Sequence, residues 1–370
     1  MPGKAATCGR IVAIGGAEIR SGDLDVLGHF VACCGGHGAR VVVLTAASRE
    51  PAERNRDYAA AFRALGVEEV AFFHQEHREE ASDAALLAAV DAADGVFFTG
   101  GSQLKLVSTI AGTPLEARLR ARYFAGMTLG GTSAGASALS TVMIARGEGR
   151  VAARLAAVRM SPGLGFVPQA IIDQHFRERD RLGRLIAAVL CNPGMLGLGL
   201  DEGAAFVLDP VGCLSVVGRG TLTVVDGSAL EATNVAAVPD QAPAAYAGVR
   251  LHALCAGWSY DLATREGCEL AMAEFEREIG FDRLAAVHAN DSKIPLGGMR
   301  DRHENIGEGH IGYAGFREIM RHPAFRDVPF LLEVPGIEGG GPDEENVNRL
   351  KAIREELGIP APGPAAATPA

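Results

Sequence analysis

This 370-residue chain lacks the features that mark secreted, membrane and disulfide-rich proteins. None of its seven cysteines forms a C-x-x-C pair and their number is odd, so we expect buried free thiols rather than disulfides. No apolar run approaches the roughly 20 residues that a membrane-spanning helix requires. The N-terminal sequence MPGKAATCGR has no long apolar core, which argues against a secretory signal. These absences predict a cytoplasmic protein without a membrane partner.

The chain also has fewer basic than acidic residues. The chain has 35 lysines and arginines against 45 aspartates and glutamates, a formal net charge of −10. Such a balance argues against binding to nucleic acid or to an anionic membrane surface. Hydrophobic residues make up 48% of the chain and charged residues 22%, which is typical of a folded globular protein. The length allows two domains.

Up to about residue 140, short apolar runs alternate with segments of helical periodicity. Four runs predict strands: Arg10–Gly16, Arg40–Ala46, Glu69–His74 and Gly95–Gly101. Fully apolar strands separated by amphipathic helices predict an α/β fold with a parallel sheet covered on both faces. The active site of such a sheet lies outside the carboxyl ends of its strands. From about residue 195 to 256 the sequence becomes rich in predicted strands, closing with Arg250–Ala256.

Small and polar residues gather at three predicted strand ends, in Gly15–Glu18, Gly100–Gln103 and Gly130–Ser137. No G-x-G-x-x-G pattern follows the first strand, so no dinucleotide cofactor is expected. In the third stretch, GTSAG fits the G-x-S-x-G pattern of a nucleophile elbow centred on Ser133. Small neighbours allow a sharp turn and leave the hydroxyl accessible. The other interpretation is that they only let a helix pack closely on the sheet.

A nucleophilic serine needs a base within hydrogen-bond reach and a third group that orients the base. His175 is the candidate base, because it ends an apolar strand and precedes four arginines within eight residues. Glu202, in the run GLDEG, is the candidate third group, with Asp201 as the neighbouring alternative. The order Ser, His, Glu differs from the order in α/β-hydrolases. The N–H of Ala134 and the Gly100–Gly101 pair are candidates for the oxyanion hole.

Six ordered motifs between residues 9 and 263 resemble those of peptidase E-like serine peptidases, and specifically of the cyanophycinase family. They are AIGGAE (13–18), TGGSQLK (99–105), GGTSAGA (130–136), DQHF (173–176) followed by arginines, GLDE (199–202) and VVDGS (224–228). The resemblance implies a flavodoxin-like layered sheet similar to that of class I glutamine amidotransferases. It also implies a homodimer that needs no cofactor or metal.

The reaction that this resemblance implies is hydrolysis of cyanophycin, multi-L-arginyl-poly-L-aspartate, to β-Asp-Arg dipeptides through an acyl-enzyme. Ser133 would be the nucleophile, His175 the base and Glu202 the orienting acid. Substrate-binding positions of the family match Gln103, Lys105, Asp173, Gln174, Arg179, Arg181 and Arg184. Arginines suit substrate carboxylates, although a solvated basic helix face is the simpler interpretation. The alternatives are an Asp-specific dipeptidase of the peptidase E type and a binding scaffold with an unreactive Ser133.

Residues 264–337 resemble a different family, the zinc-dependent apurinic-site nucleases of the endonuclease IV type, which are TIM barrels. Four residues match zinc-ligand positions of that family: His288, Asp301, His303 and Glu333. The earlier strands of the barrel are missing, so we expect a partial barrel fragment left by a gene fusion. Weak zinc binding and a zinc-dependent DNA-repair endonuclease are the alternatives. Residues 338–370 predict a helical and low-complexity tail whose last dozen residues are disordered.

Overall fold

The computed structural model describes residues 8–20, 24–269, 279–294, 300 and 302–359. The chain divides into two units, Met1–Leu270 and Ala271–Ala370, which are described separately. Within the described residues, no helix is both long and apolar enough to cross a membrane.

The described part of the first unit contains a nine-stranded mixed sheet in the order β17-β16-β11-β10-β1-β5-β4-β2-β3. Five strands are parallel: β1 (Ile11–Ile14), β2 (Arg40–Leu44), β3 (Glu69–Phe73), β4 (Gly95–Phe98) and β5 (Thr128–Thr132). Four antiparallel strands extend it: β10 (Ala204–Leu208), β11 (Cys213–Gly218), β16 (Trp258–Asp261) and β17 (Glu266–Glu269). The predicted layered α/β fold is confirmed, and the antiparallel extension makes the sheet mixed.

Alternating side chains of β1 enter two different cores, as expected for a strand buried on both faces. Val12 and Ile14 pack with α1 (Asp25–Cys33) and α2 (Pro51–Ala64), where Phe30 and Phe97 stand edge to face with their centroids 5.1 Å apart. Residues of the opposite face belong to a second core that also contains residues of four further helices. These helices are α3 (Ala84–Ala92), α4 (Gln103–Ile110), α5 (Pro114–Tyr123) and α6 (Ala134–Ala138).

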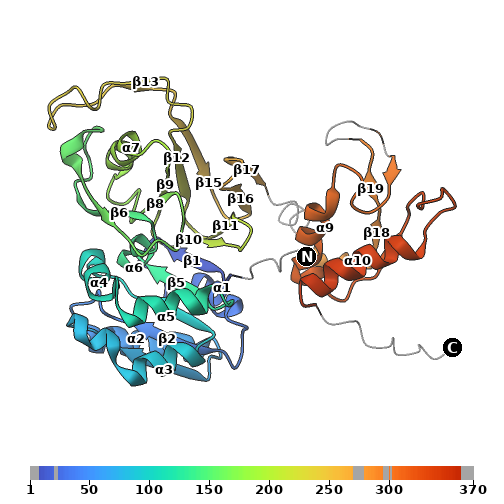
Figure 1. Ribbon diagram of the computed structural model, residues 1–370, viewed down its shortest axis with the longest axis horizontal. Coiled ribbons are helices and arrows are strands. Elements are labelled where there is room, and N and C mark those ends of the chain that lie inside the picture. Colours follow the sequence, from blue (N-terminus) through green and yellow to red (C-terminus); the bar gives the residue numbers. More distant parts are fainter. Residues whose placement is uncertain (1–7, 21–23, 270–278, 295–299, 301, 360–370) are drawn as a thin grey trace. The chain divides into compact units, whose positions relative to one another are not determined.

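The second half of the first unit also forms a smaller sheet, in the order β15-β12-β9-β8 (Figure 1). Its strands are β8 (Ala170–Gln174), β9 (Leu196–Leu200), β12 (Leu222–Asp226) and β15 (Arg250–Leu254). The last three fall in the region that the sequence predicts to be rich in strands, and β8 precedes it. The helix α7 (Leu182–Cys191) packs on this sheet through a third core. Two hairpins complete the unit, β6 (Val142–Gly147) with β7 (Val158–Pro162) and β13 (Ala232–Thr233) with β14 (Tyr246–Ala247).

The boundary between the units lies a few residues beyond the one predicted after residue 263. Strands β16 and β17 pair antiparallel across the turn that contains residues 262–265, so this turn belongs to the first unit. The predicted limit was the end of the family resemblance, whereas the hydrogen bonds between β16 and β17 continue the first unit to Glu269.

The described part of the second unit has a two-stranded parallel sheet, β18 (Val287–Ala289) with β21 (Phe330–Leu332), and no closed barrel. A short pair, β19 (Asp291–Ser292) with β20 (His303–Glu304), and the helices α9 (Gly312–Arg321) and α10 (Glu344–Glu356) complete it. A small core joins these elements and includes Phe316, Leu350 and Ile353. The predicted partial barrel is thus confirmed. Of the last dozen residues, predicted to be disordered, all but Ile359 lie outside the described residues.

Asp291 holds the turns of this second unit together. Its carboxylate is fully buried and accepts hydrogen bonds from four backbone N–H groups, those of Ser292, Gly307, Ile311 and Gly312, at 2.8–3.0 Å. Two of these groups lie at the start of α9, where a carboxylate also interacts favourably with the helix dipole.

Candidate active site

Ser133 stands on a sharp turn between β5 and α6, in a backbone conformation that a non-glycine residue seldom adopts (φ +51°, ψ −112°). Its N–H donates to the carbonyl of Ile14 at 2.9 Å, which ties the turn to the end of β1. A Cβ placed on Gly131 would lie 2.6 Å from the carbonyl carbon of Gly135, and one on Gly135 would lie 2.3 Å from the carbonyl oxygen of Phe98. The glycines are therefore required by close backbone approach, as in a nucleophile elbow.

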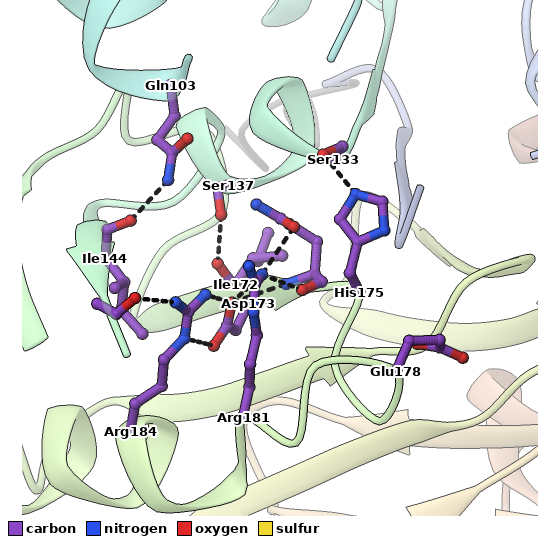
Figure 2. Close-up of polar contacts among 12 residues, drawn as sticks. Gln103, Ser133, Ser137, Ile144, Ile172, Asp173, His175, Glu178, Arg181 and Arg184 are labelled. Atoms are coloured by element: carbon purple, nitrogen blue, oxygen red, sulfur yellow. Dashed lines mark hydrogen bonds and ion pairs between the residues drawn. The ribbon is translucent and has the colours of Figure 1, made fainter. Parts of the chain in front are cut away.

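His175 follows β8 and also has a positive φ, +46°. Its Nε2 lies 2.9 Å from the Ser133 hydroxyl (Figure 2), and its Nδ1 lies 2.6 Å from Oε1 of Glu202. A carboxylate only accepts hydrogen bonds, so the proton of the neutral ring belongs on Nδ1 and Nε2 is left to accept the serine proton. The structure thus brings together the three residues that the sequence nominated as nucleophile, base and acid.

Asp201, the alternative acid, has a different position. Its side chain is fully buried and accepts hydrogen bonds from the Thr221 hydroxyl at 2.6 Å and from the N–H groups of Thr221 and Arg177 at 3.1 Å. It therefore joins the turn after β9 to neighbouring segments, while Glu202 contacts the imidazole. The N–H of Glu202 in turn donates to Oε2 of Glu178 at 3.2 Å.

The surroundings of His175 favour its neutral form. Burial lowers the pKa of the imidazole, and the nearby charges of Arg179 and Arg181 lower it further. The hydrogen bond to Glu202 opposes this shift, but the net result is a pKa below the ordinary value for histidine. At neutral pH the ring is therefore unprotonated and can act as a base.

The Gly100–Gly101 pair, which follows β4, lies beside the serine. A Cβ on Gly100 would lie 3.3 Å from Cβ of Ser133, so this backbone approaches the nucleophile closely. No backbone carbonyl among the described residues accepts the N–H of either glycine. Ala134, whose N–H is the second candidate donor, is the first residue of α6.

The expected substrate-binding residues differ in burial: four are buried, Gln103 and Lys105 are half-buried, and Arg179 is exposed. Asp173 is buried and accepts hydrogen bonds from Nη1 of Arg181 at 3.2 Å and from Nε of Arg184 at 2.7 Å (Figure 2). Arg181 also donates to the side-chain oxygen of Gln174, and Arg184 donates to the carbonyl of Gly147. Burial lowers the pKa of Arg181 to about 10, so it stays charged at neutral pH.

The remaining expected residues make contacts outside this network. Gln103 donates to the carbonyl of Ile144 at 2.8 Å. The ammonium of Lys105 pairs with Glu76 at 2.7 Å, and this ion pair and the His74 ring lower the pKa of Glu76 to about 2. Arg179 is exposed, and no hydrogen bond or ion pair engages its guanidinium within the described residues.

The loop after β1 is a part of the site to which the sequence assigned no role. The carbonyl of Gly15 accepts the N–H of His175 at 2.8 Å, and the imidazole lies directly against Gly16. Glu18 is buried and accepts hydrogen bonds from the hydroxyls of Tyr58 and Thr132. The signal in the sequence that could have identified Glu18 is its position two residues after the Gly15–Gly16 pair at a strand end.

A cavity of about 370 Å³ opens beside the serine. Its lining comes from the loops after β1, β2 and β4, from the elbow and from α2: Ala17, Glu18, Arg20, Ser48, Arg49, Glu50, Arg54, Tyr58, Gly100, Gly101, Ser102, Thr132 and Ser133. This position, outside the carboxyl ends of parallel strands, is where ligands bind in open α/β sheets.

The residues that match zinc-ligand positions do not form a cluster in the described part of the second unit. Nδ1 of His288 pairs with Oε2 of Glu333 at 2.9 Å, and both side chains are more than half exposed. His303 is on β20, and Asp301 lies outside the described residues. No group of three or more His, Cys, Asp or Glu residues suited to a metal ion is found among the residues that the structure describes.

Comparison with known proteins identifies the family of the first unit. The sequence model of peptidase family S51 matches residues 11–211, more than half of the chain. The chain belongs to peptidase family S51. It is accordingly a peptidase of the serine hydrolase class.

Relatives of the S51 unit extend the match beyond residue 211. A cyanophycinase of Synechococcus elongatus is 39% identical over 259 residues, 70% of this chain and 80% of that protein. A cyanophycinase of Geminocystis herdmanii is 37% identical over 257 residues, 69% of this chain and 94% of that protein. The crystal structure of a peptidase from an acI-B1 actinobacterium shares the fold, with a TM-score of 0.50 and 21% identity over 72% of this chain and 98% of that one.

The second unit is similar to a different group of proteins. The sequence model of xylose isomerase-like TIM barrels matches residues 252–358. A probable endonuclease 4 of Haloarcula marismortui is 46% identical over 105 residues, 28% of this chain and 37% of that protein. The chain spans about a third of the length of these endonuclease relatives, in agreement with a partial barrel.

Proposed function

We propose that this S51 peptidase hydrolyses cyanophycin, multi-L-arginyl-poly-L-aspartate, and releases β-Asp-Arg dipeptides. The observation that carries the chemistry is the continuous chain of contacts from Ser133 through His175 to Glu202, at 2.9 and 2.6 Å. The substrate is proposed from the similarity to cyanophycinases over most of their length. It is supported by the charged residues of both signs around the serine, since each unit of the polymer carries a carboxylate and a guanidinium.

The proposed reaction proceeds in two halves. In the first, Oγ of Ser133 attacks the carbonyl carbon of the scissile amide while Nε2 of His175 takes the hydroxyl proton. The N–H groups of Ala134 and of the Gly100–Gly101 pair stabilise the negative oxygen of the tetrahedral intermediate. The carbon–nitrogen bond then breaks, and His175 returns the proton to the leaving amine, which leaves an ester on Ser133.

The second half repeats these steps with water. His175 takes a proton from a water molecule as the water oxygen attacks the ester carbon. Collapse of this intermediate returns the proton to Oγ of Ser133 and releases the carboxylate product. Glu202 holds the Nδ1 proton throughout, so the ring keeps the orientation that both halves need.

The buried and exposed charges take different parts in substrate binding. We assign Asp173, Arg181 and Arg184 to a fixed wall, because most of the contacts of the two arginines are internal. Arg179 is the exposed cation that binds a substrate carboxylate, and Gln103, Gln174 and Lys105 complete the polar lining. Binding of this kind weakens as the salt concentration rises.

Incubation of the purified protein with cyanophycin, without added metal, tests the proposal, with Ser133→Ala as the control. We expect β-Asp-Arg from the parent protein and none from the variant. If a serine-directed covalent inhibitor labels Ser133 but no dipeptide is released, the substrate is another Asp-containing peptide, as for a dipeptidase of the peptidase E type. If neither is observed, the elbow is only a packing device and the proposal is wrong.

The setting of the enzyme is also proposed. We infer a cytoplasmic homodimer, supported for the location by the free thiols of all six cysteines whose side chains are described. The dimer follows from the resemblance to cyanophycinases, and light scattering should give twice the chain mass of 38.5 kDa.

The second unit is proposed to be a remnant of a gene fusion. Stoichiometric zinc, together with salt-dependent binding to DNA, would instead favour a repair endonuclease.

A further inference from the structure

The cavity beside Ser133 contains a buried carboxylate whose charge the catalytic steps do not use. The side chain of Glu18, in a residue only 6% exposed, lines this cavity and accepts hydrogen bonds from two hydroxyls, those of Tyr58 and Thr132. No lysine, arginine or histidine of the described residues lies within ion-pair distance of it. A carboxylate has about four acceptor positions, so two remain for a ligand.

A buried anion without a cation is unfavourable, because two neutral donors replace only part of the water that it loses. The protein does have arginines close by. Arg20 and Arg54 line the same cavity, but both donate to Asp57, at 3.0 and 3.5 Å. One carboxylate balances only one of these two positive charges, but both guanidiniums donate to Asp57 and neither donates to Glu18. Glu18 therefore has no ion-pair partner among the described residues, and a cationic group of a ligand fits this place.

The mouth of the cavity has a complementary charge. Arg49 lines the cavity and is exposed, and its guanidinium makes no hydrogen bond or ion pair within the described residues. The cavity thus offers a buried carboxylate and a free guanidinium to one ligand. A substrate group that carries a guanidinium and a carboxylate together, as an arginyl residue with a free α-carboxylate does, has the matching pair of charges.

The backbone connects this cavity directly to the catalytic residues. Glu18 follows Gly16, against which the His175 ring lies, and Thr132, which donates to Glu18, directly precedes Ser133. None of Gln103, Asp173, Gln174, Arg181 and Arg184 is among the residues that line it. The cavity is therefore separate from the polar residues expected to bind substrate, and it shares Ser133 with the catalytic triad.

We propose that this cavity is a substrate subsite in which Glu18 binds the guanidinium of an arginyl side chain and Arg49 binds its carboxylate. The inference rests on the proposed function, whose polymer supplies such arginyl groups. It adds a determinant of specificity: the enzyme selects arginine over a neutral side chain of the same shape through Glu18. Glu18 is a binding residue here, and it takes no part in proton transfer.

Titration calorimetry on the full-length Ser133→Ala protein tests the subsite without turnover. The ligand is a synthetic trimer of β-Asp-Arg, and its control is the same trimer with citrulline, which replaces the guanidinium by a neutral urea of similar shape. We expect the arginyl trimer to bind at least tenfold more tightly than the citrullinyl trimer. Adding Glu18→Gln, which removes the charge and leaves one oxygen to accept from a hydroxyl while its NH2 donates to the other hydroxyl, should abolish this preference.

Glu53→Gln is the matched control, because Glu53 is an exposed carboxylate on the helix α2 that lies outside the cavity lining. It should leave the preference for arginine unchanged. Arg49→Gln should weaken binding of both trimers by a similar factor, since both carry the carboxylate.

The outcomes separate this inference from the proposed function. If the arginyl preference survives Glu18→Gln, or if the trimers do not bind, the subsite assignment is wrong, even where the parent protein still releases β-Asp-Arg. If the preference depends on Glu18 but Ser133-dependent release is absent, the subsite stands and the proposed reaction fails. Each comparison is made only with Glu18→Gln protein that is folded, as shown by an unchanged melting temperature. If that variant unfolds, Glu18→Asp replaces it, and a shortened carboxylate should reduce the preference without abolishing it.

Discussion

The imidazole of His175 lies against Gly16: a Cβ placed on that glycine would lie 2.4 Å from Cε1 of the ring. The φ of Gly16 is +106°, which side chains seldom tolerate, so an alanine there is strained as well as crowded. We expect Gly16→Ala to displace the ring from Ser133 and to reduce kcat by about 100-fold, since small displacements of a catalytic group have large effects. Steady-state kinetics test this, and an unchanged kcat in a folded variant would contradict it.

Glu202 and Asp201 are adjacent acids with separable effects. Glu202→Gln should reduce kcat by about 10³- to 10⁴-fold because the Nδ1 proton loses its acceptor charge, while the melting temperature should change little. Asp201→Asn should mainly lower the melting temperature, since its buried carboxylate joins Thr221 to Arg177. Kinetics and thermal denaturation on both variants check the assignment. The reverse pattern would make Asp201 the acid of the triad.

The pH dependence of kcat/KM reports on His175. Because burial and two arginines lower the pKa of this ring, the active neutral form should persist below pH 6.5, and activity should fall only as the pH drops through the lowered pKa. Arg179→Gln removes one of the lowering charges, so the acidic limb should move to higher pH. An uncharged ester substrate keeps substrate binding out of the comparison. A limb that stays in place would show that Arg179 does not act on the imidazole.

The network around Asp173 should matter for stability. Asp173→Asn leaves the buried guanidiniums of Arg181 and Arg184 with a neutral partner, and loss of one member of such a pair destabilises a protein by about 3 kcal/mol. Urea denaturation of the parent and variant measures the difference. A change below about 1 kcal/mol would indicate that the two arginines are held by other contacts, or that they move to solvent.

Removal of the second unit should leave catalysis intact. A chain that ends after Glu269 keeps β17 and therefore the complete large sheet. We expect its kcat/KM on cyanophycin to lie within about twofold of the full-length value, because all residues assigned to the reaction belong to the first unit. A large loss of activity or solubility would mean that the second unit is more than a remnant. A chain that ends after Ala263 is the matched comparison, and it should be less stable because it lacks β17.

The sequence predicts those parts of the site that depend on local pattern. Ser133 and His175 follow apolar strands directly, so the turn glycines and the DQH run identify them without knowledge of the fold. Glu202 was the candidate acid, and the family resemblance also assigned it this role, but the residues alone left Asp201 as an alternative. Adjacent residues of a turn point in different directions, and the tertiary structure shows that Glu202 contacts the ring.

Contacts between segments far apart in the chain could not be predicted from the sequence. Glu18 is 40 residues from Tyr58 and 114 from Thr132, so nothing in its own motif indicates a buried hydrogen-bonded carboxylate. The internal pairing of Arg184 with Asp173 was also missed, although only 11 residues separate them. Arginines after a strand look alike in sequence whether they point to a ligand or to a neighbouring acid.

Asp291 makes the backbone around it independent of strands from outside the second unit. Its carboxylate accepts the N–H groups of the next residue on β19, of one turn and of the start of α9. These four N–H groups are therefore satisfied from within the unit, and among the described residues no further strand pairs with β18 or β21. A segment whose turn and helix start are tied to one of its own side chains keeps these contacts in any chain that contains it.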